Sequence, residues 1–249
     1  RRHGRKGALV DRLMRAPPKN VDVLFVEGTN LGSGKPTPTE SELEGQLVDL
    51  LHATPGRVFV TWSAQNVDRT VSLYRACLRT GRELVVDLHT AEVLHLLAPH
   101  ARIPSPAEDP GVPPQWPALR VLVTSRYRRR TVRRGLVELV NGWARACGTS
   151  VKRLRPNGVV VAVRPAMMAD LVAGGVDPRP QDAWVFSMWR GYLQIASMRG
   201  MADWFAAAGA RVEHIHTSGH ASPDDIRAFV QAIGARHVVP VHGERWNEP

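Results

Sequence analysis

Apolar and polar residues follow one another in blocks along the chain, and these blocks predict alternating strands and helices. Nearly continuous apolar runs, typical of parallel strands covered on both faces, occur at 21–27, 58–62, 83–87, 119–124, 158–163 and 183–187. Apolar positions at helical spacing predict helices at 7–15, 40–52, 65–79, 90–98, 131–147 and 166–173. This order predicts an α/β fold containing a Rossmann-like parallel sheet.

Residues 211–242 predict one more strand, helix and strand. The strands are expected at 211–217 and 237–242. The helix between them begins at Ser222, whose hydroxyl suits an N-cap, and ends at Gly234. We expect this crossover to place the two strands parallel in one sheet.

The predicted crossover brings three candidate side chains to one sheet edge. His220 follows the first strand, His242 ends the second, and Glu27 ends the strand at 21–27. Ligand sites of open α/β sheets lie outside the carboxyl ends of the strands. Two imidazoles, a carboxylate and a helix N-terminus suited to phosphate therefore indicate a hydrolytic or phosphate-handling site.

The surrounding histidines allow a structural alternative. One histidine near a strand end is more often structural than functional, although three polar residues on one edge favour function. His214, His216, Ser218 and His220 alternate and would share a strand face as far as the strand extends. A zinc chelate made by His214 and His216 alone is disfavoured because no third ligand follows nearby.

The composition adds a basic charge. The net charge of +10 and the isoelectric point of about 10.7 favour a polyanionic partner. Most basic residues are Arg, and Ala, Gly and Pro are abundant, so part of the excess can be a compositional habit. The segment 126–134 concentrates six arginines around Tyr127, either as a solvated helix entrance or as a phosphate-contacting patch.

Cysteines and apolar segments exclude several classes of protein. Cys77 and Cys147 lie far apart within helical patterns, so we expect core residues rather than a disulfide framework or a thiolate metal site. No apolar run approaches the roughly 18 residues of a membrane helix. The N-terminal segment lacks the pattern of a signal peptide, so the expected location is the cytoplasm.

Four motifs carry a family resemblance: VEGTN at 26–30, FSMWRGY at 186–192, HTSGHAS at 216–222 and PVHGE at 240–244. Together they resemble the ribonuclease J-like β-CASP family of metallo-β-lactamase-fold proteins. The resemblance implies part of an αββα metallo-β-lactamase fold with an inserted Rossmann-like β-CASP domain. The implied domains are a lactamase segment at 1–49, the β-CASP domain at 50–190 and the C-terminal lactamase segment, with its RNA-metabolising motif, at 191–249.

The resemblance also implies chemistry and residue roles. It implies a two-zinc phosphodiesterase in which a metal-bound hydroxide attacks phosphorus. His242 would be a zinc ligand, while His220 would contact the scissile phosphate and protonate the leaving oxygen, oriented by Glu27. The residues expected to bind phosphate or substrate are His216, Ser218, Gly219 and Ser222.

One departure from the family is large. The principal metal motif, H-x-H-x-D-H, is absent, as are a later His and the bridging Asp. We therefore expect a fragment that is inactive alone, the alternative being a natural inactive relative.

The expected function is zinc-dependent RNA hydrolysis; a non-catalytic RNA-binding subunit and a hydrolase of small esters or phosphoesters are alternatives. DNA as substrate, exo- or endonuclease action and a homodimer stay open.

Overall fold

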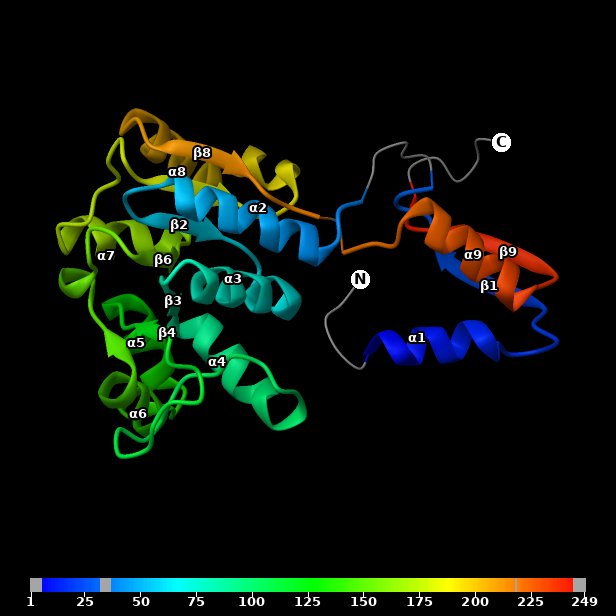
Figure 1. Ribbon diagram of the computed structural model, residues 1–249, viewed down its shortest axis with the longest axis horizontal. Helices are drawn as coiled ribbons and strands as arrows, with labels where there is room; N and C mark the ends of the chain where they lie inside the picture. The colour runs from blue at the N-terminus through cyan, green and yellow to red at the C-terminus, as the bar shows by residue number, and fades with distance from the viewer. Residues whose placement is uncertain (1–5, 32–36, 218, 244–249) are drawn as a thin grey trace. The chain divides into compact units, whose positions relative to one another are not determined.

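The chain forms two compact units in the computed structural model, which describes residues 6–31, 37–217 and 219–243 (Figure 1). Unit 1 combines the two ends of the chain, residues 1–40 and 217–249. Unit 2 is the continuous segment 41–216.

Unit 2 contains a parallel sheet. Within the described residues this sheet has seven strands in the order β5-β4-β3-β6-β2-β7-β8. The strands are β2 (Val58–Thr61), β3 (Glu83–Asp87), β4 (Leu119–Leu122), β5 (Gly148–Thr149), β6 (Val159–Ala162), β7 (Ala183–Phe186) and β8 (Arg211–His214). The α-helices are α2 (Glu40–Ala53), α3 (Val67–Arg79), α4 (Leu88–Leu97), α5 (Ser125–Arg133), α6 (Val137–Ala146), α7 (Met168–Ala173) and α8 (Ala196–Ala207). The short 3-10 turns are η1 (Ala98–His100), η2 (Val151–Arg153), η3 (Pro165–Met167) and η4 (Arg190–Gln194).

Helices cover both faces of this sheet. One core cluster joins α2, α3, α4 and α6 to one face, with Trp143 fully buried. A second cluster packs α7 and α8 on the other face, where Trp184 stacks on Phe205 with ring centroids 5.3 Å apart. Because both faces are covered, every residue of β2, β6 and β7 is buried, which explains their unbroken apolar sequence. The predicted α/β class and parallel sheet are confirmed.

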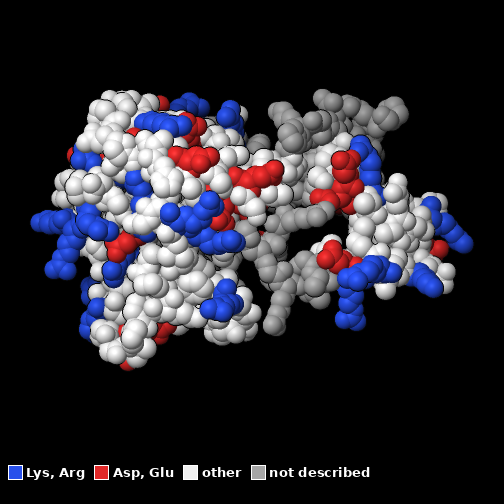
Figure 2. Space-filling view, viewed as in Figure 1, with Lys and Arg blue, Asp and Glu red and all other residues white. Residues whose placement is uncertain are grey.

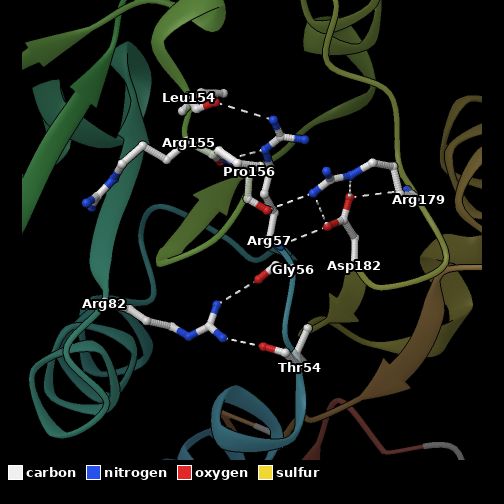
Figure 3. Close-up of polar contacts among 9 residues, drawn as sticks. All are labelled: Thr54, Gly56, Arg57, Arg82, Leu154, Arg155, Pro156, Arg179 and Asp182. Carbon is white, nitrogen blue, oxygen red and sulfur yellow. Dashed lines mark hydrogen bonds and ion pairs between the residues drawn. The ribbon is translucent and has the colours of Figure 1, made fainter.

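Arginines hold the loops at the amino-terminal edge of this sheet (Figure 3). Arg57 donates from Nε to the Arg155 carbonyl at 2.8 Å, and its backbone N–H donates to Asp182 Oδ1 at 2.8 Å. The Arg179 guanidinium pairs with the same carboxylate, with Nη2 and Oδ1 3.0 Å apart. Arg82 donates to the carbonyls of Leu51, Thr54 and Gly56. The charges at this edge are therefore used by the fold.

Unit 1 is smaller and contains α1 (Lys6–Arg15), β1 (Val23–Glu27), α9 (Pro223–Ile233) and β9 (His237–Val241). β1 and β9 form a parallel two-stranded sheet in which Glu27 is opposite Val241. α9 buries Ile226 and Ile233 and ends at Gly234, whose φ of +60° is a left-handed conformation that glycine adopts readily. The predicted helix from Ser222 to Gly234 is confirmed.

The predicted crossover between residues 211–217 and 237–242 is wrong. β8 pairs with β7 in the sheet of unit 2, whereas β9 pairs with β1 in unit 1. The helix between them therefore does not connect neighbouring strands. The apolar pattern indicates that residues 211–217 and 237–242 each contain a strand. It does not indicate which distant strand each one pairs with.

The compact units also differ from the predicted domain boundaries at 49/50 and 190/191. Leu43 and Leu47 of α2 are buried in the core of unit 2, so this unit begins at Ser41. Met201 and Phe205 of α8 are buried in the second core cluster, and β8 extends the same sheet, so unit 2 continues to His216. These segments join unit 2 because their apolar side chains pack there.

The segment predicted as one helix at 131–147 is two helices. α5 includes most of the arginine-rich stretch at 126–134, which was predicted to lie between a strand and a helix. Gly135, with a φ of +79°, separates α5 from α6. α5 forms because Tyr127 and Thr131, four residues apart, both face the core, whereas the arginines between them face outward.

Cys77 and Cys147 are both buried in unit 2, as predicted. Burial raises the pKa of both thiols, so each remains a neutral core group. Within the described ranges, every helix is too short or too polar to span a bilayer.

Candidate functional site

The candidate site of unit 1 lies at the carboxyl ends of β1 and β9. Glu27 is the last residue of β1, and His242 directly follows β9. The Gly28 N–H donates to the Val241 carbonyl at 2.7 Å, so the pairing continues one step beyond the strands. Thr29 Oγ1 then donates to the His242 carbonyl at 3.0 Å. The parallel pairing therefore brings the predicted Glu27 and His242 to one edge.

Two glycines allow the backbones that follow β1 and β9 to approach each other closely. A Cβ on Gly243 would lie 3.0 Å from the Gly28 carbonyl oxygen, and a Cβ on Gly28 would lie 3.3 Å from Pro240 Cβ. His242 itself has a φ of +62°, a left-handed conformation that costs a residue other than glycine on the order of 1 to 2 kcal/mol. Strained backbone of this kind is concentrated at functional sites.

Glu27 holds the loop that carries His220. Its Oε2 contacts His220 Nδ1, and its Oε1 accepts a hydrogen bond from the Ala221 N–H at 2.6 Å. The side chains of His220 and Glu27 are 37% and 32% exposed, so the pair is sheltered but open to a ligand. Both carboxylate oxygens are thus used to orient one imidazole and its backbone.

This contact engages one ring nitrogen of His220. Because Nδ1 faces the carboxylate, a proton exchanged with a bound molecule would be carried by Nε2. The geometry is that of a general acid or base oriented by a carboxylate. The His242 ring lies close by, with its centroid 6.0 Å from that of His220 at an angle of 64°.

Asn30 and Thr29 are site residues that the sequence analysis did not single out. Asn30 Nδ2 donates to the Ala221 carbonyl at 2.8 Å, so the His220 loop is held by Glu27 on one side and Asn30 on the other. Thr29 fixes the backbone of His242. The sequence feature that could have indicated them is their position in VEGTN, directly after the strand that ends with Glu27.

The predicted phosphate ligands have different surroundings. Ser222 is the N-cap of α9: its Oγ accepts a hydrogen bond from the Asp225 N–H at 3.1 Å and donates to Asp225 Oδ2 at 2.8 Å. A phosphate would have to compete with this carboxylate, so the role of Ser222 stays a prediction. Gly219 is exposed next to His220, and Ser218 lies outside the described residues.

His216 is the last residue of unit 2, and its role in binding substrate stays a prediction. The shared strand face was expected only as far as the strand extends, and β8 ends at His214, so His216, Ser218 and His220 lie beyond it. His214 is held within unit 2 by the Met188 carbonyl, 2.9 Å from its Nε2. Its ring stacks on Phe186, which is a structural environment.

A complete zinc site is not formed by the part of the chain that the structure describes. Structural and catalytic zinc sites need three or four protein ligands. Among the described residues, no group of three or more His, Cys, Asp and Glu side chains could hold a metal ion. His242 can supply one imidazole, so its assignment as a zinc ligand stays a prediction.

Comparison with known proteins finds one matching family model and several relatives named as ribonucleases. Residues 208–246 match the family model of the Zn-dependent metallo-hydrolase RNA specificity domain. The chain is 25% identical over 245 residues to ribonuclease J of Mycobacterium tuberculosis, an alignment that covers 93% of this chain and 38% of that protein. It is 22% identical over 238 residues to ribonuclease J2 of Bacillus subtilis, an alignment that covers 90% of this chain and 37% of that protein. The chain thus spans less than two fifths of the length of these relatives.

A solved structure shares the fold. A protein of unknown function from Enterococcus faecalis aligns with a TM-score of 0.62 and 16% identity, over 97% of this chain and 50% of that one. The domain match and the ribonuclease J alignments together support the resemblance of this chain to the ribonuclease J-like β-CASP family.

Proposed function

We propose that this chain contributes the proton-transfer pair and an RNA-binding module to a zinc-dependent ribonuclease of the ribonuclease J kind. The observation that carries the proposal is the contact of Glu27 with both His220 Nδ1 and the Ala221 N–H. The family match to an RNA specificity domain, which covers His220 and His242, supports RNA as the substrate. We propose unit 2 as the inserted β-CASP module, unit 1 as part of the lactamase domain, and the cytoplasm as the location.

The proposed role of His220 is to protonate the leaving oxygen of the cleaved phosphodiester. Glu27 orients the ring so that Nε2 delivers the proton, while Asn30 prevents the His220 loop from shifting. Ser218, Gly219 and Ser222 are proposed to contact phosphate oxygens beside it, and His216 the substrate.

Zinc is proposed as the cofactor because the matching family is zinc-dependent. His242 would be one of its ligands. Since the described residues do not form a complete site, the remaining ligands must come from outside them. The complete protein is therefore proposed to be active, and these 249 residues alone to be inactive.

The test compares histidine variants of the complete protein that contains this chain. His220→Ala should lower the single-turnover rate of RNA cleavage by about 10²- to 10⁴-fold, the usual contribution of a positioned general acid. Bound zinc, measured by atomic absorption, should stay unchanged in this variant. His242→Ala should lose zinc. The matched control is His237→Ala, at the exposed amino-terminal end of β9, which should change neither quantity.

A second candidate is a non-catalytic RNA-binding chain, favoured by the incomplete set of metal ligands in the described residues. A complete protein that binds RNA but contains no zinc and cleaves nothing would overturn the ribonuclease in favour of this candidate. Full cleavage activity in His220→Ala would show that the proton-transfer role is wrong.

A further inference from the structure

Helix α5 of unit 2 carries arginines that the fold does not use. The helix follows β4 at the carboxyl-terminal edge of the sheet. Its anchors are Thr131, which is buried, and Tyr127, which packs against both core clusters. The anchors lie four residues apart on one face, so they fix which face of the helix is turned outward.

Four arginines form a stripe along the exposed side. Their spacing is i, i+3, i+4 and i+7, which places them on one helical face. All four are exposed, and basic side chains project from the side of unit 2 on which α5 lies (Figure 2). We call this set the arginine stripe; it consists of Arg126, Arg129, Arg130 and Arg133.

In the part of the chain that the structure describes, no carboxylate pairs with the arginine stripe. Within the described residues, none of its four guanidinium groups takes part in an ion pair, and α5 itself contains no acidic residue. On α4, which contacts α5, the N-cap residue Asp87 pairs with Arg164, and Glu92 pairs with Arg134. Like charges three and four residues apart repel each other on a helix. The stripe is therefore a local excess of charge that an external anion would stabilise.

The geometry suits a chain of phosphates rather than a single anion. At 1.5 Å per residue, the stripe from Arg126 to Arg133 is about 10 Å long. Cβ atoms three and four residues apart lie about 5 to 6 Å from each other, so the stripe offers several separate guanidinium groups. α5 presents no exposed aromatic side chain for base stacking, because its one aromatic residue, Tyr127, packs inward. Contacts of this kind bind the backbone and do not read the sequence.

We propose that the arginine stripe binds the phosphodiester backbone of single-stranded RNA, in contact with about two or three phosphates. This inference rests on the proposed function, because it assigns a second RNA contact, in unit 2, to a protein whose chemistry lies in unit 1. It predicts affinity without sequence preference and with a strong dependence on salt.

The test measures binding of the 249-residue chain to fluorescent oligouridylate by anisotropy, over a series of potassium chloride concentrations. The stripe variant replaces the four arginines with glutamine. The slope of log K against log salt should become shallower by about 0.7 per lost phosphate contact, or about 1.4 to 2.1 in all. Affinity at 0.1 M salt should fall on the order of 10- to 100-fold. The same loss with oligothymidylate would support a contact to phosphates rather than to 2′-hydroxyls.

A matched control removes the same total charge elsewhere on unit 2. Arg102, Arg145, Arg153 and Arg199 are exposed and form no ion pair within the residues that the structure describes. Replacing these four with glutamine should leave the slope close to that of the wild type. Equal losses in the two quadruple variants would overturn the proposal, because net charge alone would then explain the binding.

Two further outcomes separate this inference from the proposed function. If the stripe variant binds the oligonucleotide as the wild-type chain does, with the same salt slope, the inference is overturned but the proposed function is not. No binding by the wild-type chain even at low salt would overturn both the RNA substrate and the stripe. The circular dichroism spectrum must match that of the wild type and urea unfolding must show no loss of stability. A variant with lysine at the four positions should restore most of the slope because it restores the charge.

Discussion

Arginines occupy two edges of the same sheet in unit 2, and they behave in opposite ways. At the amino-terminal edge, Arg57, Arg82 and Arg179 are engaged with carbonyl oxygens or with the buried carboxylate of Asp182 (Figure 3). At the carboxyl-terminal edge, the arginine stripe of α5 is exposed and forms no ion pair within the described part of the chain. One residue type thus serves the fold at one edge and is available to a ligand at the other.

This difference shows that net charge is a poor guide to function until each charge is placed. Burial lowers the pKa of Arg57 from its usual value, the charge of Arg179 adds to this effect, and Asp182 opposes it. Such a group is tolerated because its hydrogen bonds are satisfied. The excess charge of +10 therefore has to be divided between arginines that the fold needs and arginines that it does not.

The largest effect is expected from Asp182→Ala. Asp182 is 1% exposed and accepts hydrogen bonds from the backbone N–H groups of Arg57 and Arg179 as well as pairing with the Arg179 guanidinium. Its removal leaves buried donors and positive charge unpaired, which should lower the free energy of unfolding by about 3 to 5 kcal/mol. Urea denaturation followed by circular dichroism measures the change. Asp177→Ala, at an exposed position, is the matched control and should shift stability by less than about 0.5 kcal/mol.

A smaller loss is expected from Arg82→Gln. Arg82 donates to carbonyls in the last turn of α2 and beyond it, at Leu51, Thr54 and Gly56. These carbonyls have no partner within the helix, so losing a charged donor should cost about 1.5 to 3 kcal/mol in unfolding free energy. The same substitution at exposed Arg102 should have no measurable effect. If the two variants were equally stable, the proposed division between structural and free arginines would be wrong.

The smallest effect on stability, and the opposite sign, is expected for the stripe variant. Its arginines include four pairs of like charges at i,i+3 or i,i+4, each of which costs a helix about 0.2 to 0.5 kcal/mol. Neutralisation should therefore leave the unfolding free energy unchanged or raise it slightly, and any gain should vanish at high salt. Denaturation at low and high salt measures this. A loss above about 1 kcal/mol would show that the stripe is structural.

Much of the fold could be predicted from local pattern. The strands β2, β3, β6 and β7 are buried on both faces. Each is therefore an apolar run that can be recognised as a strand from its own residues. α5 was missed because five of its nine residues are Arg and only Tyr127 and Thr131 reach the core. A helix anchored by two side chains gives a weak periodic signal.

The candidate site was predicted in part. Glu27 and His220 are in contact, and His242 lies beside them, because the β1–β9 pairing and the His220 loop meet at one edge. The route by which they were expected to meet, through a β8–β9 pairing, was wrong. The position of Thr29 and Asn30 after β1 was visible in the sequence, but their hydrogen-bond partners could not be predicted, since each bonds to backbone about 190 to 215 residues away.

The sequence by itself determined the α/β class, the buried strands, the N-cap and C-cap of α9, and the family motifs, because each of these depends on residues close together in the chain. Only the tertiary structure decided which strands pair, where the two units divide, and which arginines are neutralised. Those outcomes depend on contacts between distant segments, where the free energy comes from apolar burial and from satisfied buried polar groups. The two sets of arginines look alike in the sequence, and only their surroundings separate them.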